Sequence, residues 1–158
     1  MSEEVHYDRR PQLVEVAGRS MEPSLGLGSR VWVTPDSGNA KPGDIALIRG
    51  REGWILHRVV ATHAEGDEVL VFHRGDAGGG IGCCPATAIA GTAVAFLDPS
   101  ASFPKLESMG HRFLSSFVAA QRRVRVFVRL RRLARFAGLH RSVLRPRLAR
   151  LSQALLNG

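Results

Sequence analysis

Three short segments of the chain carry the side chains best suited to chemistry. Ser20 lies in the segment GRSMEPSLGLG, His57 in WILHRVV and Asp76 in FHRGDAGG. A serine becomes a nucleophile when a base removes its proton, a role that a neutral histidine fills well. A carboxylate can then orient that histidine and stabilise its protonated form. Ser20, His57 and Asp76 are therefore the candidate catalytic residues.

The neighbours of Ser20 suit a rigid loop. Gly18 permits a close approach of the backbone, Met21 can anchor the loop in the core, and Pro23 fixes the exit direction. A loop of this kind could present a hydroxyl group rigidly. Many Gly-x-Ser segments are simply turns, so this loop alone does not predict catalysis.

His57 lies within a strongly apolar stretch, where burial lowers the pKa of an imidazole and favours the neutral form that a base requires. The alternative is a core histidine, and for Asp76 it is a carboxylate that organises its own turn. The chain has two lysines, Lys41 in a turn and Lys105 in a linker. Because neither lies in an apolar strand, a Ser–His pair is favoured over a Ser–Lys pair.

The front two-thirds of the chain predicts a mainly β fold. Its apolar segments are short, rich in Val and Ile, and separated by Gly, Pro, Asp or Asn. We expect PDSGNAKPGD and the Gly-rich GDAGGGIGCCP to be loops. Spacing of this kind favours a small barrel or coiled β-sheet. The expected strands cover residues 13–18, 29–35, 43–50, 53–63, 68–75 and 91–98.

The sequence divides into a β domain at 1–100, a linker at 101–109 and an Arg-rich helical tail at 110–158. Residues 1–107 hold 10 Lys and Arg against 14 Asp and Glu, whereas residues 108–158 hold 12 Arg and no acid. The net charge of +8 therefore comes from the tail. We expect helices from about residue 110 to 137 and from about 146 to 156, although RVRVFVRLR in the first also alternates like a strand.

The tail has three possible roles. Arg122, Arg125, Arg129 and Arg132 share one helical face, and much of the opposite side is apolar. A basic amphipathic helix suits an anionic membrane surface. It equally suits packing on the acidic β domain or on a partner protein. Nucleic-acid binding is the least favoured role, because the tail lacks Tyr, Trp and any recognisable motif.

Composition argues against several other classes of protein. Cys83 and Cys84 are adjacent, with no CxxC spacing and no matching His, so we expect free thiols, no metal and no cofactor. No apolar run approaches the ~20 residues that span a bilayer. The acidic N-terminus does not read as a secretory signal. We therefore expect a cytoplasmic protein, for which the Arg-rich tail is the candidate site of peripheral membrane contact.

The order SMEP, KPGDIALIR, LHRVV and GD resembles the signal peptidase family of serine proteases, most closely its archaeal and endoplasmic-reticulum type. The resemblance covers residues 13–96. It implies that Ser20 is the nucleophile, that His57 replaces the lysine base of typical bacterial members, and that Asp76 is the candidate acid. It also implies curled β-sheets, as in the self-cleaving repressor peptidases, and a peptide or preprotein substrate with small residues before the cut.

Three features depart from the family pattern. Members of this type usually carry a further acid beyond the Gly-Asp box, but AGGGIGCC has none, so the third catalytic role rests on Asp76 or is unfilled. The usual N-terminal transmembrane helix does not appear, and the Arg-rich tail is not part of the familiar catalytic core. Two functions follow: a serine endopeptidase that cleaves a leader or signal peptide, or a non-catalytic relative that binds peptides or docks on membranes.

Overall fold

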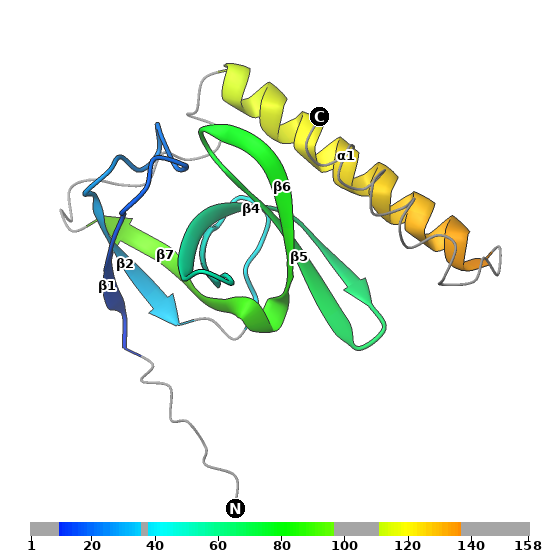
Figure 1. Ribbon diagram of the computed structural model, residues 1–158, viewed down its shortest axis with the longest axis horizontal. Helices are drawn as coiled ribbons and strands as arrows, with labels where there is room; N and C mark the ends of the chain where they lie inside the picture. The colour runs from blue at the N-terminus through cyan, green and yellow to red at the C-terminus, as the bar shows by residue number, and fades with distance from the viewer. Residues whose placement is uncertain (1–9, 36–37, 97–110, 137–158) are drawn as a thin grey trace, which may run out of the picture.

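The structure is a computed structural model that describes residues 10–35, 38–96 and 111–136. Its described part is one curled, antiparallel sheet of seven strands with a helix across one face (Figure 1). The strands run in the spatial order β1-β2-β7-β3-β4-β5-β6. Their bounds are Gln12–Glu15 (β1), Arg30–Pro35 (β2), Ile45–Arg49 (β3), Trp54–Glu65 (β4), Glu68–Gly75 (β5), Gly78–Pro85 (β6) and Ile89–Phe96 (β7), with a short 3₁₀ turn at Ala86–Ala88.

The six expected strands are present, and the mainly β class is confirmed. The expectation that GDAGGGIGCCP forms a loop is wrong, because most of it is strand β6. Gly78 and Gly79 have positive φ angles of 109° and 91°, which lets the chain reverse direction after β5. The residues that follow then pair with β5, and Ile81 is buried in the core.

The core beneath the Ser20 segment anchors that loop on the sheet. Met21 and Leu25 are 1% and 0% exposed and pack with Val16, Val31 and other apolar strand residues. The N–H of Gly28 donates to the Val16 carbonyl and the N–H of Val16 to the Ser29 carbonyl, both at 2.8 Å. These bonds close the loop at its base, and the expected anchoring role of Met21 is confirmed.

The first expected tail helix is present as α1, His111–Phe136. Phe117, Ala120 and Val124 on α1 pack against an apolar cluster on the sheet formed by Val60, Phe72 and Ile81. Gln121 donates to the Val60 carbonyl at 3.2 Å, and Arg74 donates to Ser116 Oγ at 2.9 Å. Helix α1 therefore packs on β4, β5 and β6 of its own chain. The linker and the second expected helix lie outside the described residues.

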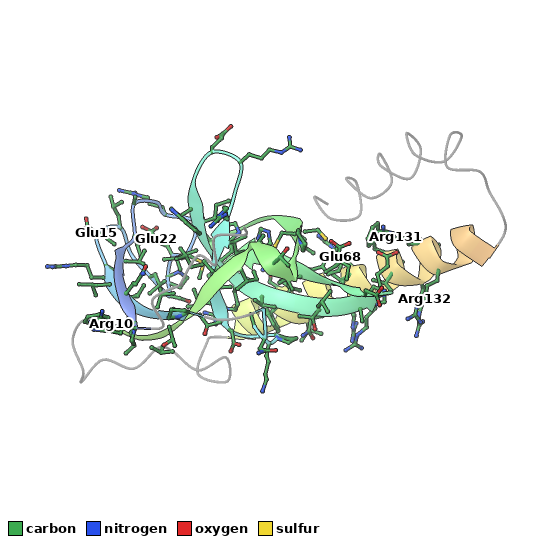
Figure 2. The ribbon with its side chains drawn as sticks, turned by 90° about the horizontal axis from the view of Figure 1, so that it is seen from below. Arg10, Glu15, Glu22, Glu68, Arg131 and Arg132 are labelled. Carbon is green, nitrogen blue, oxygen red and sulfur yellow. The ribbon has the colours of Figure 1, made fainter. Side chains whose placement is uncertain are left out.

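Packing of α1 leaves its basic face directed outward. Arg122, Arg125, Arg129 and Arg132 are all exposed, as the helical spacing predicts. Arg131 and Arg132 project near one end of the molecule, whereas Glu15 and Glu22 lie near the other (Figure 2). Within the described residues, no helix combines the length and apolar character needed to cross a bilayer.

Candidate active site

Ser20 is exposed on its loop, and that loop is held against the turn between β5 and β6. The N–H of Ala77 donates to the Ser20 carbonyl at 2.9 Å. A Cβ atom on Gly75 would collide with that same carbonyl oxygen and lie 3.1 Å from Ser20 Cβ. Only glycine therefore allows the serine loop to lie this close to the end of β5. At Gly18, where we expected the close approach, a Cβ would meet nothing within 4 Å.

His57 lies in β4, partly buried, with Ala46 of β3 as its register partner. Burial lowers the pKa of His57 below 6.5, while the charge of nearby Asp76 opposes that shift. The neutral imidazole is therefore the favoured form at neutral pH, as a general base requires. Within the described residues, Ser20 Oγ and His57 share no hydrogen bond.

The hydrogen-bond partner of His57 is a second histidine. His57 Nδ1 lies 3.0 Å from Nδ1 of His73 in β5, and the ring centroids are 5.2 Å apart. His73 is 8% exposed. Its burial, together with the neighbouring His57, lowers the pKa of His73 to about 4. Both rings are thus neutral near pH 7, and they share one hydrogen bond.

Asp76 is bound by the residue that follows His57. Arg58 Nε donates to Asp76 Oδ1 at 2.9 Å, and Arg58 Nη2 donates to Oδ2 at 2.7 Å. Both side chains are buried, with 6% and 2% exposure. The hydrogen bonds that the structure describes for the Asp76 carboxylate thus run to Arg58 and not to His57. Asp76 acts on His57 through its charge.

Arg58 also joins the other segments that carry the family resemblance. It donates to the Gly43 carbonyl at 2.7 Å and to Ser24 Oγ at 3.3 Å. Gly43 belongs to the KPGD segment, and Ser24 to the loop that carries Ser20. One buried guanidinium therefore ties together the serine loop, the KPGD turn and the Gly75–Asp76 turn. A planar side chain with five donors is suited to such a junction.

Cys83 and Cys84 lie on β6 as free thiols. Burial raises the pKa of Cys83, and it raises the pKa of Cys84 to about 11. Both are therefore thiols at neutral pH and weak nucleophiles. No group of three or more His, Cys, Asp or Glu side chains within the described ranges could hold a metal ion.

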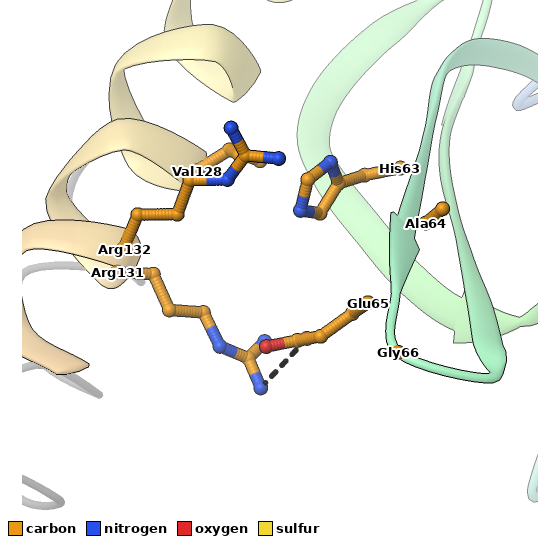
Figure 3. A pocket seen from close by; sticks show the side chains of 7 residues that line it. All are labelled: His63, Ala64, Glu65, Gly66, Val128, Arg131 and Arg132. Carbon is orange, nitrogen blue, oxygen red and sulfur yellow. Dashed lines mark ion pairs between the residues drawn. The ribbon is translucent and has the colours of Figure 1, made fainter. Parts of the chain in front are cut away.

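A pocket lies away from these residues, between the β4–β5 hairpin and α1 (Figure 3). Arg131 and Glu65 form an ion pair across it at 3.1 Å. Ser20, His57 and Asp76 do not line it. Its lining residues are His63, Ala64, Glu65, Gly66, Val128, Arg131 and Arg132.

Sequence reasoning missed two residues of this site, Arg58 and His73. Arg58 stands in the LHRVV segment and His73 in FHRGD, so both were in view. Their roles depend on the register of β4 and β5, which places Val59 opposite His73 and Arg58 opposite Arg74. No sequence pattern gives that register. The signal that the sequence did offer was one histidine in each of two consecutive apolar segments, His57 in WILHRVV and His73 in EVLVFHRG.

Comparison with known proteins gives a limited similarity. No family model matches the chain, and no solved structure matches it. Over 66 residues the chain is 36% identical to the signal peptidase complex catalytic subunit SEC11 of Scheffersomyces stipitis. That region covers 40% of this chain and 40% of the relative, so the match spans well under half of either protein. The similarity supports a signal peptidase-like character over part of the chain.

Proposed function

We propose that this protein is a serine endopeptidase of the signal peptidase type, with Ser20 as nucleophile, His57 as general base and Asp76 as an electrostatic partner of the base. The observation that carries the proposal is the docking of the Ser20 carbonyl on the Ala77 N–H. This contact holds an exposed serine at the end of the strand whose His73 contacts His57. The partial likeness to a signal peptidase subunit points the same way.

The proposed reaction proceeds in two steps. Ser20 Oγ attacks the scissile carbonyl carbon while His57 takes its proton. His57 then gives that proton to the leaving amine, the C–N bond breaks, and an acyl-enzyme remains. In the second step His57 takes a proton from water while the water oxygen attacks the ester carbon. The ester C–O bond then breaks, His57 returns the proton to Ser20 Oγ, and the acid product leaves. The Ser20–His57 hydrogen bond absent from the free protein forms when substrate binds, as in other such sites.

The strand order offers an edge for an extended substrate. Within the described sheet β1 pairs with β2 only, so alternate residues of β1 direct their backbone N–H and C=O groups away from every described strand. A peptide that adds as a strand here would run toward the loop that carries Ser20. By the family resemblance, the substrate is a leader or signal peptide with small residues before the cut.

The first test is acylation of Ser20 by p-nitrophenyl acetate. The release of p-nitrophenol measures the rate, and mass spectrometry then locates the acetyl group. Acetylation at Ser20 that is lost in both Ser20→Ala and His57→Ala is the expected result. Ser29→Ala and His63→Ala are matched controls, because Ser29 closes the same loop and His63 lies on the same strand β4. Both controls should retain acetylation.

An unreactive Ser20 in folded protein would overturn the peptidase proposal. The alternative, a non-catalytic module that binds peptides, is favoured by one observation: Asp76 bonds to Arg58 instead of His57. In that case a peptide with an Ala-x-Ala sequence would bind at the β1 edge without cleavage. Peptide binding by the wild type with no cut product, retained in Ser20→Ala, would identify this alternative.

For the tail we propose a peripheral contact with anionic lipid through charge alone, because the apolar side of α1 packs on the sheet while Arg122, Arg125 and Arg129 are exposed. Vesicles with anionic phosphatidylglycerol should co-sediment the protein, and neutral vesicles should not. Replacement of Arg122, Arg125 and Arg129 by Glu should abolish binding. The same change at exposed Arg19, Arg30 and Arg51 of the β domain is the matched control. Equal losses in both variants would contradict a specific role for α1.

A further inference from the structure

The contact between His57 and His73 constrains where the protons of the two rings lie. A hydrogen bond between two Nδ1 atoms 3.0 Å apart needs one N–H and one lone pair. Because burial keeps both rings neutral, each ring carries one proton on one of its two nitrogens. Two arrangements satisfy these conditions. Either His57 donates and His73 accepts, or the roles are reversed.

The two arrangements differ in what His57 can do. If His57 donates from Nδ1, its Nε2 has a free lone pair and can take a proton. If His57 accepts at Nδ1, its Nε2 carries the proton and cannot serve as a base. The same tautomer requirement applies to every serine–histidine pair, which usually satisfies it with a carboxylate at Nδ1. In this chain the Asp76 carboxylate is bound to Arg58, and His73 stands beside Nδ1 of His57, where a carboxylate usually lies.

His73 is held firmly enough to perform this task. Its register partner is Val59 on β4, two residues from His57, so both histidines lie on one face of the sheet. On the other side its partner is Gly82 of β6. A Cβ atom at Gly82 would collide with the His73 ring and lie 2.7 Å from its Nε2. The glycine therefore leaves the space that the ring fills beside His57.

We propose that His73 is a positioning residue that accepts a hydrogen bond from Nδ1–H of His57 and so fixes His57 in the tautomer whose Nε2 is free to act as base. This inference rests on the proposed peptidase function for the use of that base. Asp76 and His73 then divide the work of a single orienting carboxylate. His73 sets the tautomer and ring orientation, while Asp76 contributes charge. Gly82, in the acid-free segment GGGIGCC, supports this arrangement because its missing side chain leaves room for the His73 ring.

The direct test is nuclear magnetic resonance of the full chain labelled with ¹⁵N-histidine at pH 7, which distinguishes protonated from unprotonated ring nitrogens. We expect a protonated Nδ1 and a free Nε2 for His57, and the reverse for His73. This readout needs no activity and no variant. The opposite assignment, with a protonated Nε2 on His57, would overturn the inference even if Ser20 is reactive.

Two variants test the same point through the acylation of Ser20. Asparagine can place a carbonyl oxygen close to the position of His73 Nδ1, whereas leucine cannot accept a hydrogen bond. His73→Leu should slow acylation by about 10- to 100-fold, and His73→Asn should stay within about threefold of the wild type. The ring ¹⁵N signals of His57 should differ between the two variants, because only Asn preserves a hydrogen-bond acceptor for His57 Nδ1–H. His63→Leu on β4 is the matched control and should retain the wild-type rate.

The outcomes separate this inference from the proposed function. A reactive Ser20 with an unaffected rate in folded His73→Leu would overturn the role of His73 and leave the peptidase proposal intact. An unreactive Ser20 with the expected tautomers would overturn the peptidase and support the tautomer assignment. If His73→Leu fails to fold, the tautomer measurement on the wild type decides alone.

Discussion

Arg58 binds both carboxylate oxygens of Asp76 in a buried pair, with donor–acceptor distances of 2.9 and 2.7 Å. The pair links strand β4 to the turn between β5 and β6. Arg58 follows the proposed base His57 on β4, and Asp76 precedes Ala77, whose N–H donates to the Ser20 carbonyl. The charge of Asp76 that opposes the lowered pKa of His57 is fixed in place by this pair. Structure and electrostatics of the site therefore depend on the same contact.

Breaking the Arg58–Asp76 pair should destabilise the fold strongly. Asp76→Asn leaves the Arg58 charge buried without its carboxylate, and Arg58→Met leaves the reverse. Each should lower the free energy of unfolding by about 3 kcal/mol, measured by urea unfolding at pH 7. The double variant should lose at least about 1 kcal/mol less than the sum of the two single losses. Strictly additive losses would contradict a direct coupling of the pair.

The exposed pair Arg19–Glu22 provides the control. It lies in the serine loop with a 3.9 Å separation and side chains that are 76% and 45% exposed. Glu22→Gln should change the free energy of unfolding by less than about 0.5 kcal/mol, because solvent screens the interaction.

A methyl group at Gly75 should displace the nucleophile loop. Its Cβ would collide with the Ser20 carbonyl, so Gly75→Ala must break or lengthen the Ala77–Ser20 hydrogen bond. We expect acylation of Ser20 to fall by about tenfold or more and stability to fall by about 1–3 kcal/mol. Gly18→Ala is the matched control in the same loop, since open space surrounds its Cβ position. Equal effects at both glycines would contradict the docking role of Gly75.

Local patterns were sufficient to predict most elements of this fold. Alternating Val and Ile residues between turn residues indicated six of the seven strands, because strand periodicity is visible within a few residues. Strand β6 was missed because its glycines read as a loop, while its pairing with β5 is a tertiary interaction. In α1, Val124 is buried and Val126 is exposed, so the helical period held where the letters also alternate like a strand.

The site was predictable in its residue types and not in its pairings. Ser20, His57 and Asp76 were recognised from the motifs around them. The partners of Asp76 and His57, namely Arg58 and His73, depend on strand register and on which side chains turn toward one another. Such contacts join residues 16 and 18 positions apart, across strands, and no local signal encodes them.

Acid should destabilise the protein partly through His73. Its pKa is about 4 in the folded protein, whereas an unfolded histidine titrates near 6.5. Between these values the unfolded chain binds more protons, so stability falls as the pH drops from 6.5 toward 4. The loss due to His73 should approach about 3 kcal/mol below pH 4, and the lowered pKa of His57 acts in the same direction.

Urea unfolding at pH 7 and at pH 4.5 measures this contribution when the wild type is compared with His73→Asn. The variant should lose less stability between the two pH values, since Asn has no proton to bind. Identical losses in both proteins would show that His73 does not titrate with the lowered pKa.

Packing of α1 on the sheet predicts unequal effects for two valines of the same helix. Val124 is 2% exposed and contacts the sheet cluster, whereas Val126 is 46% exposed. Val124→Ala should lower the free energy of unfolding by about 2 kcal/mol, because a buried apolar side chain is truncated. Val126→Ala should be neutral or slightly stabilising, since alanine has the higher helix propensity. Equal losses of unfolding free energy for the two variants would mean that α1 does not pack on the sheet through the face that carries Val124. The packing would then not explain why Arg122, Arg125 and Arg129 are exposed.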